Sequence, residues 1–317
     1  FILAAAVMNA GGITPRLIEL ATKLVGHFRG GLGQANVVTN TLLAGVSGSS
    51  TADASTVAKL LVPEMAERGY SRPFGAALTA SGATIANLIP PSLGLIIYGS
   101  LASVSVGALF VATIVPGLLV AIALMTTVYV ISRRRGFGGD LPKASLQDRM
   151  SSLVVAIPAL ILPLLIVGGV RFGVFTATEA GAAAFAYALL CGFLFYRKLT
   201  PGNLLAAIRE SVMDTVVIVV IIAAAAPFAW VLAYEQVPQK IARSLALLSD
   251  SPIVLMLVVN MFLLVVGLFM EMIAALIILV PILVPIVTAA GVDPIHFGIV
   301  IIMNLVIGAL TPPLGVL

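Results

Sequence analysis

Residues 45–53 read Gly45-Val46-Ser47-Gly48-Ser49-Ser50-Thr51-Ala52-Asp53, inside a long and otherwise apolar stretch from Val37 to Met65. Most of these nine residues are Ser, Thr, Gly or Asp. At membrane depth, such hydroxyl groups and freed backbone carbonyl groups must find partners or face water. An oxygen-rich, glycine-flexible turn suits a hard cation such as Na⁺. The alternative is a helix interface packed through small residues, which a single Ser or Gly would favour more than this run does.

The composition around this stretch is that of a membrane protein. The chain has 317 residues, of which 61% are hydrophobic and only 9% are charged, whereas soluble domains carry about 25% charged residues. A soluble globular protein and a disordered chain are both excluded. We therefore predict an all-α polytopic membrane protein. The single cysteine, Cys191, excludes disulfides within the chain and any cysteine-based metal cluster, and no nucleic-acid-binding signature is present.

Apolar segments of two kinds follow one another along the chain. An amphipathic helix is expected at 13–28, lying along the membrane surface. Uninterrupted spans are expected at about 106–132, 152–170, 174–196 and 212–234. Interrupted segments are expected at 37–65, 74–99, 253–287 and 296–317. The chain begins inside an apolar run and stops just after a Pro-Pro pair, so we expect further sequence at both ends.

Lys and Arg residues predict the orientation. We assume that Arg133-Arg134-Arg135 is cytoplasmic and that the segments 37–65 and 253–287 are hairpins, each entering and leaving the membrane on one side. On that assumption, 14 of the 17 Lys and Arg residues fall on the cytoplasmic side. The other side receives only Arg171, Lys240 and Arg243. The net charge of +4 is therefore interpreted as a positive-inside bias and not as a partner-binding patch.

An internal repeat appears when each residue is compared with the residue 222 positions later in the chain, so that position 90 is aligned with position 312. Glycine and proline mark backbone geometry, so their coincidence says more than shared leucines would. The residues that coincide are Gly45 with Gly267, Pro63 with Pro285, Gly69 with Gly291, and Pro90-Pro91 with Pro312-Pro313. Each copy has an interrupted hairpin, a Gly-containing turn and a helix broken before Pro-Pro. Because five spanning segments separate the hairpins, the copies have inverted topology, as in secondary transporters with discontinuous helices.

This pattern predicts four regions. They are 1–33, the end of a spanning helix with the surface helix; 34–99, the first transport-domain repeat; 100–252, the scaffold and connecting helices; and 253–317, the second transport-domain repeat, truncated.

Asp53 is a carboxylate at membrane depth, which is costly and functional by default. It has two interpretations: a cap on the free N–H groups of a helix starting at Ala54, or a direct ligand or coupling group. Both are compatible, since a capped helix end still presents a positive dipole to an anion.

The two broken helices carry the other candidate oxygen ligands. Pro90 and Pro91 cannot donate backbone hydrogen bonds, which frees carbonyl groups about one turn upstream, near Asn87. The segment from Asn304 to Thr311 offers the same elements in the second copy. The alternative is that both helix breaks serve helix packing alone and bind no ion.

Two further acids have undecided roles. Glu271 lies near the tip of the second hairpin and is either functional or hydrogen-bonded to backbone. For Glu179, a stabilising acid in the first turn of a helix is favoured.

At these residues the chain resembles the large membrane subunit (M, DctM-like) of tripartite ATP-independent periplasmic (TRAP) transporters. The matching stretches are 30–32, 47–53, 89–92, 293–298 and 304–315. Two departures matter. The family often has Pro where Ala177 stands, and often Gly-Pro where Ala86-Asn87 stands, which alters one wall of the first supposed ion pocket.

The resemblance implies an elevator-type transport domain that moves against a scaffold in the bacterial inner membrane. Na⁺ would be the coupling ion, with no organic cofactor and no ATP. The implied Na⁺ ligands are Ser47, Ser49, Asn87 and Pro90 at one site, and Gly267, Asn304, Gly308 and Thr311 at the other. The residues nearest the substrate would be Ser50, Thr51 and Asp53. A small four-helix membrane subunit (Q) and a periplasmic substrate-binding protein (P) would be partners.

The sequence is therefore interpreted as a permease subunit and not an enzyme: a Na⁺-coupled, binding-protein-dependent importer of an organic acid such as a C4-dicarboxylate or sialic acid. The nearest alternative is a Na⁺- or H⁺-coupled anion transporter of similar build that needs no binding protein. A passive channel is a third possibility. An intramembrane aspartyl protease needs two facing Asp residues, and Asp53 is the only Asp deep in a predicted span. The substrate itself is left open.

Overall fold

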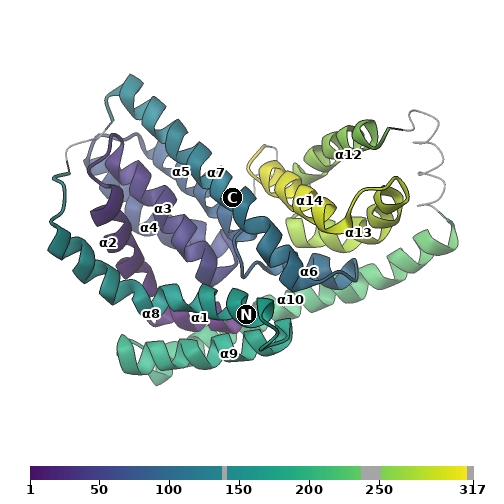
Figure 1. The fold of residues 1–317 in the computed structure, drawn as a ribbon, viewed down its shortest axis with the longest axis horizontal. Coiled ribbons are helices and arrows are strands. Elements are labelled where there is room, and N and C mark those ends of the chain that lie inside the picture. Colours follow the sequence, from purple (N-terminus) through teal and green to yellow (C-terminus); the bar gives the residue numbers. More distant parts are fainter. Residues whose placement is uncertain (138–140, 237–250, 313–317) are drawn as a thin grey trace. The chain divides into compact units, whose positions relative to one another are not determined.

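A computed structural model describes residues 1–137, 141–236 and 251–312. Within these residues the regular structure is entirely helical (Figure 1), as the composition predicts. The chain divides into two compact units. Unit 1 contains Phe1–Ser92 and Thr113–Val212, and unit 2 contains Leu93–Ala112 and the residues from Met213 onward. Each unit is described by itself.

Unit 1 holds most of the helices. Its elements are α1 (Ile2–Ala10), α2 (Ile13–Val25), α3 (Gly31–Ser47), α4 (Ser50–Glu67), α5 (Arg72–Ala83), the 3₁₀ turn η1 (Thr84–Asn87), most of α7 (Val106–Arg135), α8 (Leu146–Arg171), α9 (Ala177–Leu190), the π-helical turn η2 (Cys191–Phe195) and the start of α10 (Pro201–Tyr234). The predicted surface helix is α2, which ends at Val25.

Helix α3 forms the centre of unit 1. It packs against α1, α2, α4, α5, η1 and α8, and nearly every residue from Gly31 to Ser47 is buried. A helix that is buried on all sides needs small or apolar residues around its whole circumference, and the sequence GLGQANVVTNTLLAGVS supplies them. The polar residues of α3 must therefore find partners inside the protein.

The break between α3 and α4 is shorter than the sequence predicts. Only Gly48 and Ser49 are non-helical, whereas the polar run suggests an interruption from Val46 to Ser55. Gly48 has φ 62°, a left-handed conformation that glycine adopts without steric cost. Ser49 is extended, and the helix resumes at Ser50. Most of the polar run therefore forms the first turns of α4.

Unit 2 contains α6 (Leu93–Leu101), α12 (Pro252–Gly267), α13 (Met272–Ala289) and α14 (Pro294–Ala309), with the start of α7 and the larger part of α10. The helices α12, α13 and α14 pack against one another, and α6 packs on α13 and α14. Helices α12 and α14 approach closely at two glycines. A Cβ atom added to Gly308 would stand 2.5 Å from the Cα of Gly267.

Four helical stretches in the described part of the chain are long and apolar enough to cross a membrane. They are Val106–Arg135, Leu146–Arg171, Ala177–Phe195 and Met272–Ala289. The first three correspond to spans predicted from the sequence. Pro313, Lys240 and Arg243, which enter the predicted repeat and the predicted orientation, lie outside the described residues.

The contact between α12 and α14 predicts a stability effect. The substitution Gly308→Ala places a methyl group against the backbone of Gly267 and is expected to destabilise unit 2 by about 1–3 kcal/mol, the usual cost of overpacking. The matched control is Gly168→Ala in α8, where an added Cβ meets nothing within 4 Å. Thermal unfolding of the purified protein in detergent should show a lower midpoint for Gly308→Ala only. Equal midpoints would contradict the close approach.

Candidate functional site

The break between α3 and α4 is closed by one buried hydrogen bond. The Ser47 hydroxyl, in the last turn of α3, donates to Oδ2 of Asp53 at 2.6 Å. Asp53 is 1% exposed and Ser47 is 8% exposed. A hydroxyl that donates its proton to a carboxylate keeps its oxygen lone pairs for another partner. The Ser49 amide donates to Ser47 Oγ only weakly, at 3.4 Å, so Ser47 Oγ can still coordinate a cation.

Asp53 is not a helix cap. Helix α4 begins at Ser50, three residues before Asp53, and its N-cap residue is Ser49. The side chain of Ser49 makes no capping hydrogen bond and lies 3.3 Å from the Thr51 hydroxyl. The capping interpretation of Asp53 is therefore wrong, because the helix starts earlier than the sequence suggests. The free N–H groups of the first turn receive no side-chain cap.

The Pro-Pro break lies beside the end of α3. A Cβ atom added to Gly45 would stand 3.8 Å from the carbonyl oxygen of Pro90, an ordinary contact distance. It would stand only 2.8 Å from Cγ of Pro163, so the close approach of α8 at this point requires glycine. The turn η1 packs on α3 and α4. Asn87 is 3% exposed, and its carbonyl oxygen accepts from the Ser92 hydroxyl at 2.8 Å. The fold therefore brings the end of α3 and the broken helix together, as the candidate Na⁺ site requires.

A buried polar network, which the sequence analysis missed, connects α3 to α5. Asn40 Nδ2 donates to Asn36 Oδ1 at 2.9 Å, and Asn36 Nδ2 donates to Thr79 Oγ1 at 2.7 Å. Thr79 Oγ1 in turn donates to the carbonyl oxygen of Gly75. Asn36 and Asn40 are four residues apart on one face of a buried helix. The four-residue spacing of these two amide side chains, together with the polar residue Thr79, could have predicted the network from the sequence.

Unit 2 holds the second group of candidate residues. Asn304 is 8% exposed, and its Nδ2 donates to Oδ1 of Asn260 on α12 at 2.5 Å. Gly267 and Gly308 face each other across the same helix pair. Thr311 is exposed and donates to the carbonyl oxygen of Ile307. Sequence reasoning overlooked Asn260, although it is the only amide side chain in the apolar sequence of α12.

Both undecided acids are helix caps. Glu271 is the N-cap of α13, and its Oε2 accepts from the amides of Ile273 and Ala274 at 2.7 and 3.1 Å. Glu179 forms a capping box with Thr176 at the start of α9. The backbone-bonded interpretation of Glu271 and the first-turn interpretation of Glu179 are confirmed.

The fold and these helix breaks define a polytopic integral membrane protein. The whole chain, residues 1–317, matches the family described as "Tripartite ATP-independent periplasmic transporter, DctM component".

The chain is also similar to curated proteins of that kind. It is 43% identical to the sialic acid TRAP transporter large permease protein of Vibrio cholerae, over 99% of this chain and 74% of that protein. It is 41% identical to the 2,3-diketo-L-gulonate TRAP transporter large permease protein of Escherichia coli, with the same coverage. It is 40% identical to the C4-dicarboxylate TRAP transporter large permease protein of Pseudomonas aeruginosa, again with the same coverage. The chain belongs to the DctM family of TRAP transporter large permeases, which are transporters rather than enzymes.

The Ser47–Asp53 hydrogen bond predicts the effect of a small substitution. Ser47→Ala leaves the buried carboxylate without its side-chain donor and is expected to cost about 1.5–3 kcal/mol of unfolding free energy, as for a hydrogen bond to a charged group. Ser47→Thr keeps a hydroxyl and should retain most of the stability. The control is Ser55→Ala, because Ser55 is exposed and only bonds the carbonyl oxygen of Ala52. Chemical unfolding curves in detergent measure all three variants, and equal losses for Ser47→Ala and Ser55→Ala would contradict the assignment.

Proposed function

We propose that this chain is the large permease of a Na⁺-coupled, binding-protein-dependent importer of an organic acid. The observation that carries the proposal is the hydrogen-bonded break at Ser47–Asp53, beside the Pro-Pro break, in a chain that belongs throughout to the DctM family. Helix breaks at membrane depth are tolerated where they line a cavity or an ion site.

The first proposed Na⁺ site consists of oxygen atoms at the end of α3 and along η1. Na⁺ is a hard cation and takes oxygen ligands. Ser47 supplies a hydroxyl oxygen whose proton is already donated to Asp53. The carbonyl groups near Asn87 and Pro90 supply the rest, with Ser49 at the rim of the site. A bound cation would also stabilise the negative charge of Asp53, which connects ion binding to the shape of the hairpin tip.

The second proposed Na⁺ site uses Gly267, Asn304, Gly308 and Thr311. Close approach of the two glycines brings backbone of α12 and α14 together without intervening side chains. Asn304 directs its Nδ2 to Asn260 and to the carbonyl oxygen of Val300, which leaves its own Oδ1 as an acceptor. A cation there would hold the end of α14 against α12.

The substrate carboxylate is proposed to bind at the start of α4, near Ser50, Thr51 and Asp53. The first turn of α4 has no side-chain cap, and Thr51 is exposed, so backbone N–H groups and a hydroxyl are available to an anion. The start of α13 offers no such site, because the Glu271 carboxylate already accepts from its amides. This difference supports one anion site, at the first break only.

The relatives named above support the proposed substrate class. Those named above are described as permeases for sialic acid, 2,3-diketo-L-gulonate and C4-dicarboxylates, and all three substrates are carboxylates. An organic acid is therefore proposed here. We also propose a small membrane subunit and a periplasmic binding protein as partners, with the Arg133–Arg135 segment on the cytoplasmic side.

Alternating access by an elevator movement is proposed as the mechanism. The helices α3, α4 and α5 pack as a trio, and so do α12, α13 and α14, which supports the predicted repeat of two equivalent helical groups. Na⁺ binding would order the tips of both groups and complete the anion site. The loaded domain would then move across the membrane against the remaining helices.

The proposed coupling predicts uptake that depends on the Na⁺ gradient. In proteoliposomes that contain the permease, the small subunit and the binding protein, an inward Na⁺ gradient should drive substrate accumulation, and dissipating it should abolish accumulation. Uptake that ignores the Na⁺ gradient would refute Na⁺ coupling. Uptake that persists without the binding protein would favour the alternative, a binding-protein-independent anion transporter, and failure to accumulate against a gradient would indicate a passive channel.

The proposed anion site predicts a charge effect at Thr51. Thr51→Asp adds a negative charge beside the site, where repulsion of a carboxylate at about 4 Å costs on the order of 4 kcal/mol near a protein surface. The half-saturating substrate concentration should rise at least tenfold. The control is Ser55→Asp, one turn further along the exposed side of α4, where a smaller increase is expected. Transport kinetics in the same proteoliposomes measure both, and an unchanged half-saturation in Thr51→Asp would contradict the placement of the substrate.

A further inference from the structure

A group of cationic side chains lies where α2 ends and α8 begins. The two helices pack against each other, and the chain that leads into α8 contacts the end of α2, since Leu141 lies beside Gly26. Arg149, in the first turn of α8, places Nη2 3.5 Å from Nδ1 of His27. Lys143 is close enough to His27 to act on it electrostatically. The cluster of Lys143, Arg149 and His27 is called the rim cluster below.

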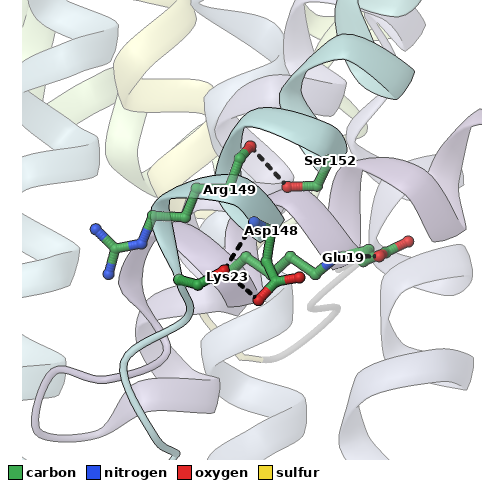
Figure 2. A network of polar contacts seen from close by, with 6 residues as sticks. Glu19, Lys23, Asp148, Arg149 and Ser152 are labelled. Carbon is green, nitrogen blue, oxygen red and sulfur yellow. Dashed lines mark hydrogen bonds and ion pairs between the residues drawn. The ribbon is translucent and has the colours of Figure 1, made fainter.

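The acids near the rim cluster have other partners. Glu19 pairs with Lys23 at 2.6 Å. Asp148 accepts from the hydroxyl of Ser145, the N-cap residue of α8, at 2.6 Å. Figure 2 shows the guanidinium group of Arg149 turned away from the Asp148 carboxylate. Within the described residues, neither Arg149 nor Lys143 forms an ion pair.

Arg149 and Lys143 therefore both lie near His27 without an acidic side chain at ion-pair distance in the part of the chain that the structure describes. The Nε of Arg149 is buried and has no hydrogen-bond partner, so the guanidinium has unused donors. Burial first, and then the charges of Arg149 and Lys143, hold the pKa of His27 below its ordinary value. Two cations beside a histidine favour the binding of an anion, which would be the ion-pair partner that Arg149 and Lys143 lack among the described residues.

The surroundings of the rim cluster are those of a membrane surface. Helix α8 is one of the helices able to cross a membrane, so its first turn lies at the boundary between lipid and water. Apolar side chains project from both helices beside the cations: Phe28 is 48% exposed just after α2, and Leu146 is 83% exposed at the start of α8. Leu24 and Met150 are exposed as well. An amphipathic helix with cations beside exposed apolar groups is typical of an element lying in the headgroup layer.

We propose that the rim cluster binds the phosphate group of an anionic phospholipid, while Phe28, Leu24, Leu146 and Met150 contact its acyl chains. Arg149 provides the planar, bidentate donor that suits a phosphate, and Lys143 adds a second charge. The lipid would connect the surface helix α2 to the spanning helix α8 and fix the depth of both in the membrane. This inference does not depend on Na⁺ coupling or on the substrate.

The test measures binding of phosphatidylglycerol to the purified, full-length permease in nonionic detergent, by native mass spectrometry. Phosphatidylcholine is the zwitterionic comparison. The double variant Lys143→Gln/Arg149→Gln should bind phosphatidylglycerol about twenty-five-fold more weakly, because each cation near a membrane surface contributes a factor of about five. The single variant Arg149→Lys, which keeps Lys143, should weaken phosphatidylglycerol binding less than the double variant does. The control is Arg171→Gln, an exposed cation at the other end of α8, which should leave binding unchanged.

Several results would overturn the proposal. Equal binding of phosphatidylglycerol and phosphatidylcholine would contradict it. An equal loss of phosphatidylglycerol binding in the double variant and in Arg171→Gln would contradict it as well. Displacement of phosphatidylglycerol by millimolar inorganic phosphate would instead identify a soluble anion as the ligand.

A second measurement leaves the cations intact, in case the double variant does not fold. Phe28→Trp in a Trp230→Phe background places the chain's only tryptophan beside the rim cluster. In bilayers, brominated phosphatidylglycerol should quench its fluorescence more strongly than brominated phosphatidylcholine at the same mole fraction. Equal quenching would contradict a preference for the anionic lipid.

Discussion

The hydrogen bond from Ser47 to Asp53 is the interaction on which the proposed site depends. An ionised carboxylate inside a protein is stable only when hydrogen bonds or charges replace the water that it has lost. Ser47 and Asp53 stand on opposite sides of the α3–α4 break, so the requirement to satisfy Asp53 also fixes how the two helices meet. The same contact leaves the Ser47 oxygen as an acceptor, which is why a structural hydrogen bond and an ion site can coincide.

The two helix breaks satisfy their free backbone groups in different ways. At the start of α13 the Glu271 carboxylate accepts from two amides, whereas the start of α4 has no side-chain cap. The helices behind the breaks also differ, since α3 is joined to α5 through a chain of amide and hydroxyl groups and α12 meets α14 at two glycines. Two groups with similar helix order can therefore have different roles, and the proposed anion site lies at the first break alone.

The charged groups of the rim cluster are proposed to act at the membrane boundary. The charged fraction of the chain is only 9%, so each cation outside an ion pair is informative. Lys143 and Arg149 are held beside His27, next to exposed apolar side chains. Such an arrangement is unfavourable in water and favourable where anionic headgroups meet acyl chains. The residues proposed to contact the headgroup layer are thus distinct from those proposed to bind the cargo.

The sequence by itself determined the class of the protein and most helix positions, because apolar segment lengths, glycine and proline act locally on the backbone. The resemblance of several short stretches to a known family indicated the family. The sequence also identified Ser47, Asp53 and Gly267 as residues at or beside helix breaks, and Asn304 as a polar residue of the last described helix. Only the tertiary structure decided their partners: that Asp53 bonds Ser47 and is not a cap, that Asn260 meets Asn304, and that Glu271 caps α13. These outcomes depend on where a helix starts to within one turn and on which helices pack together, and both are set by contacts between residues far apart in the sequence.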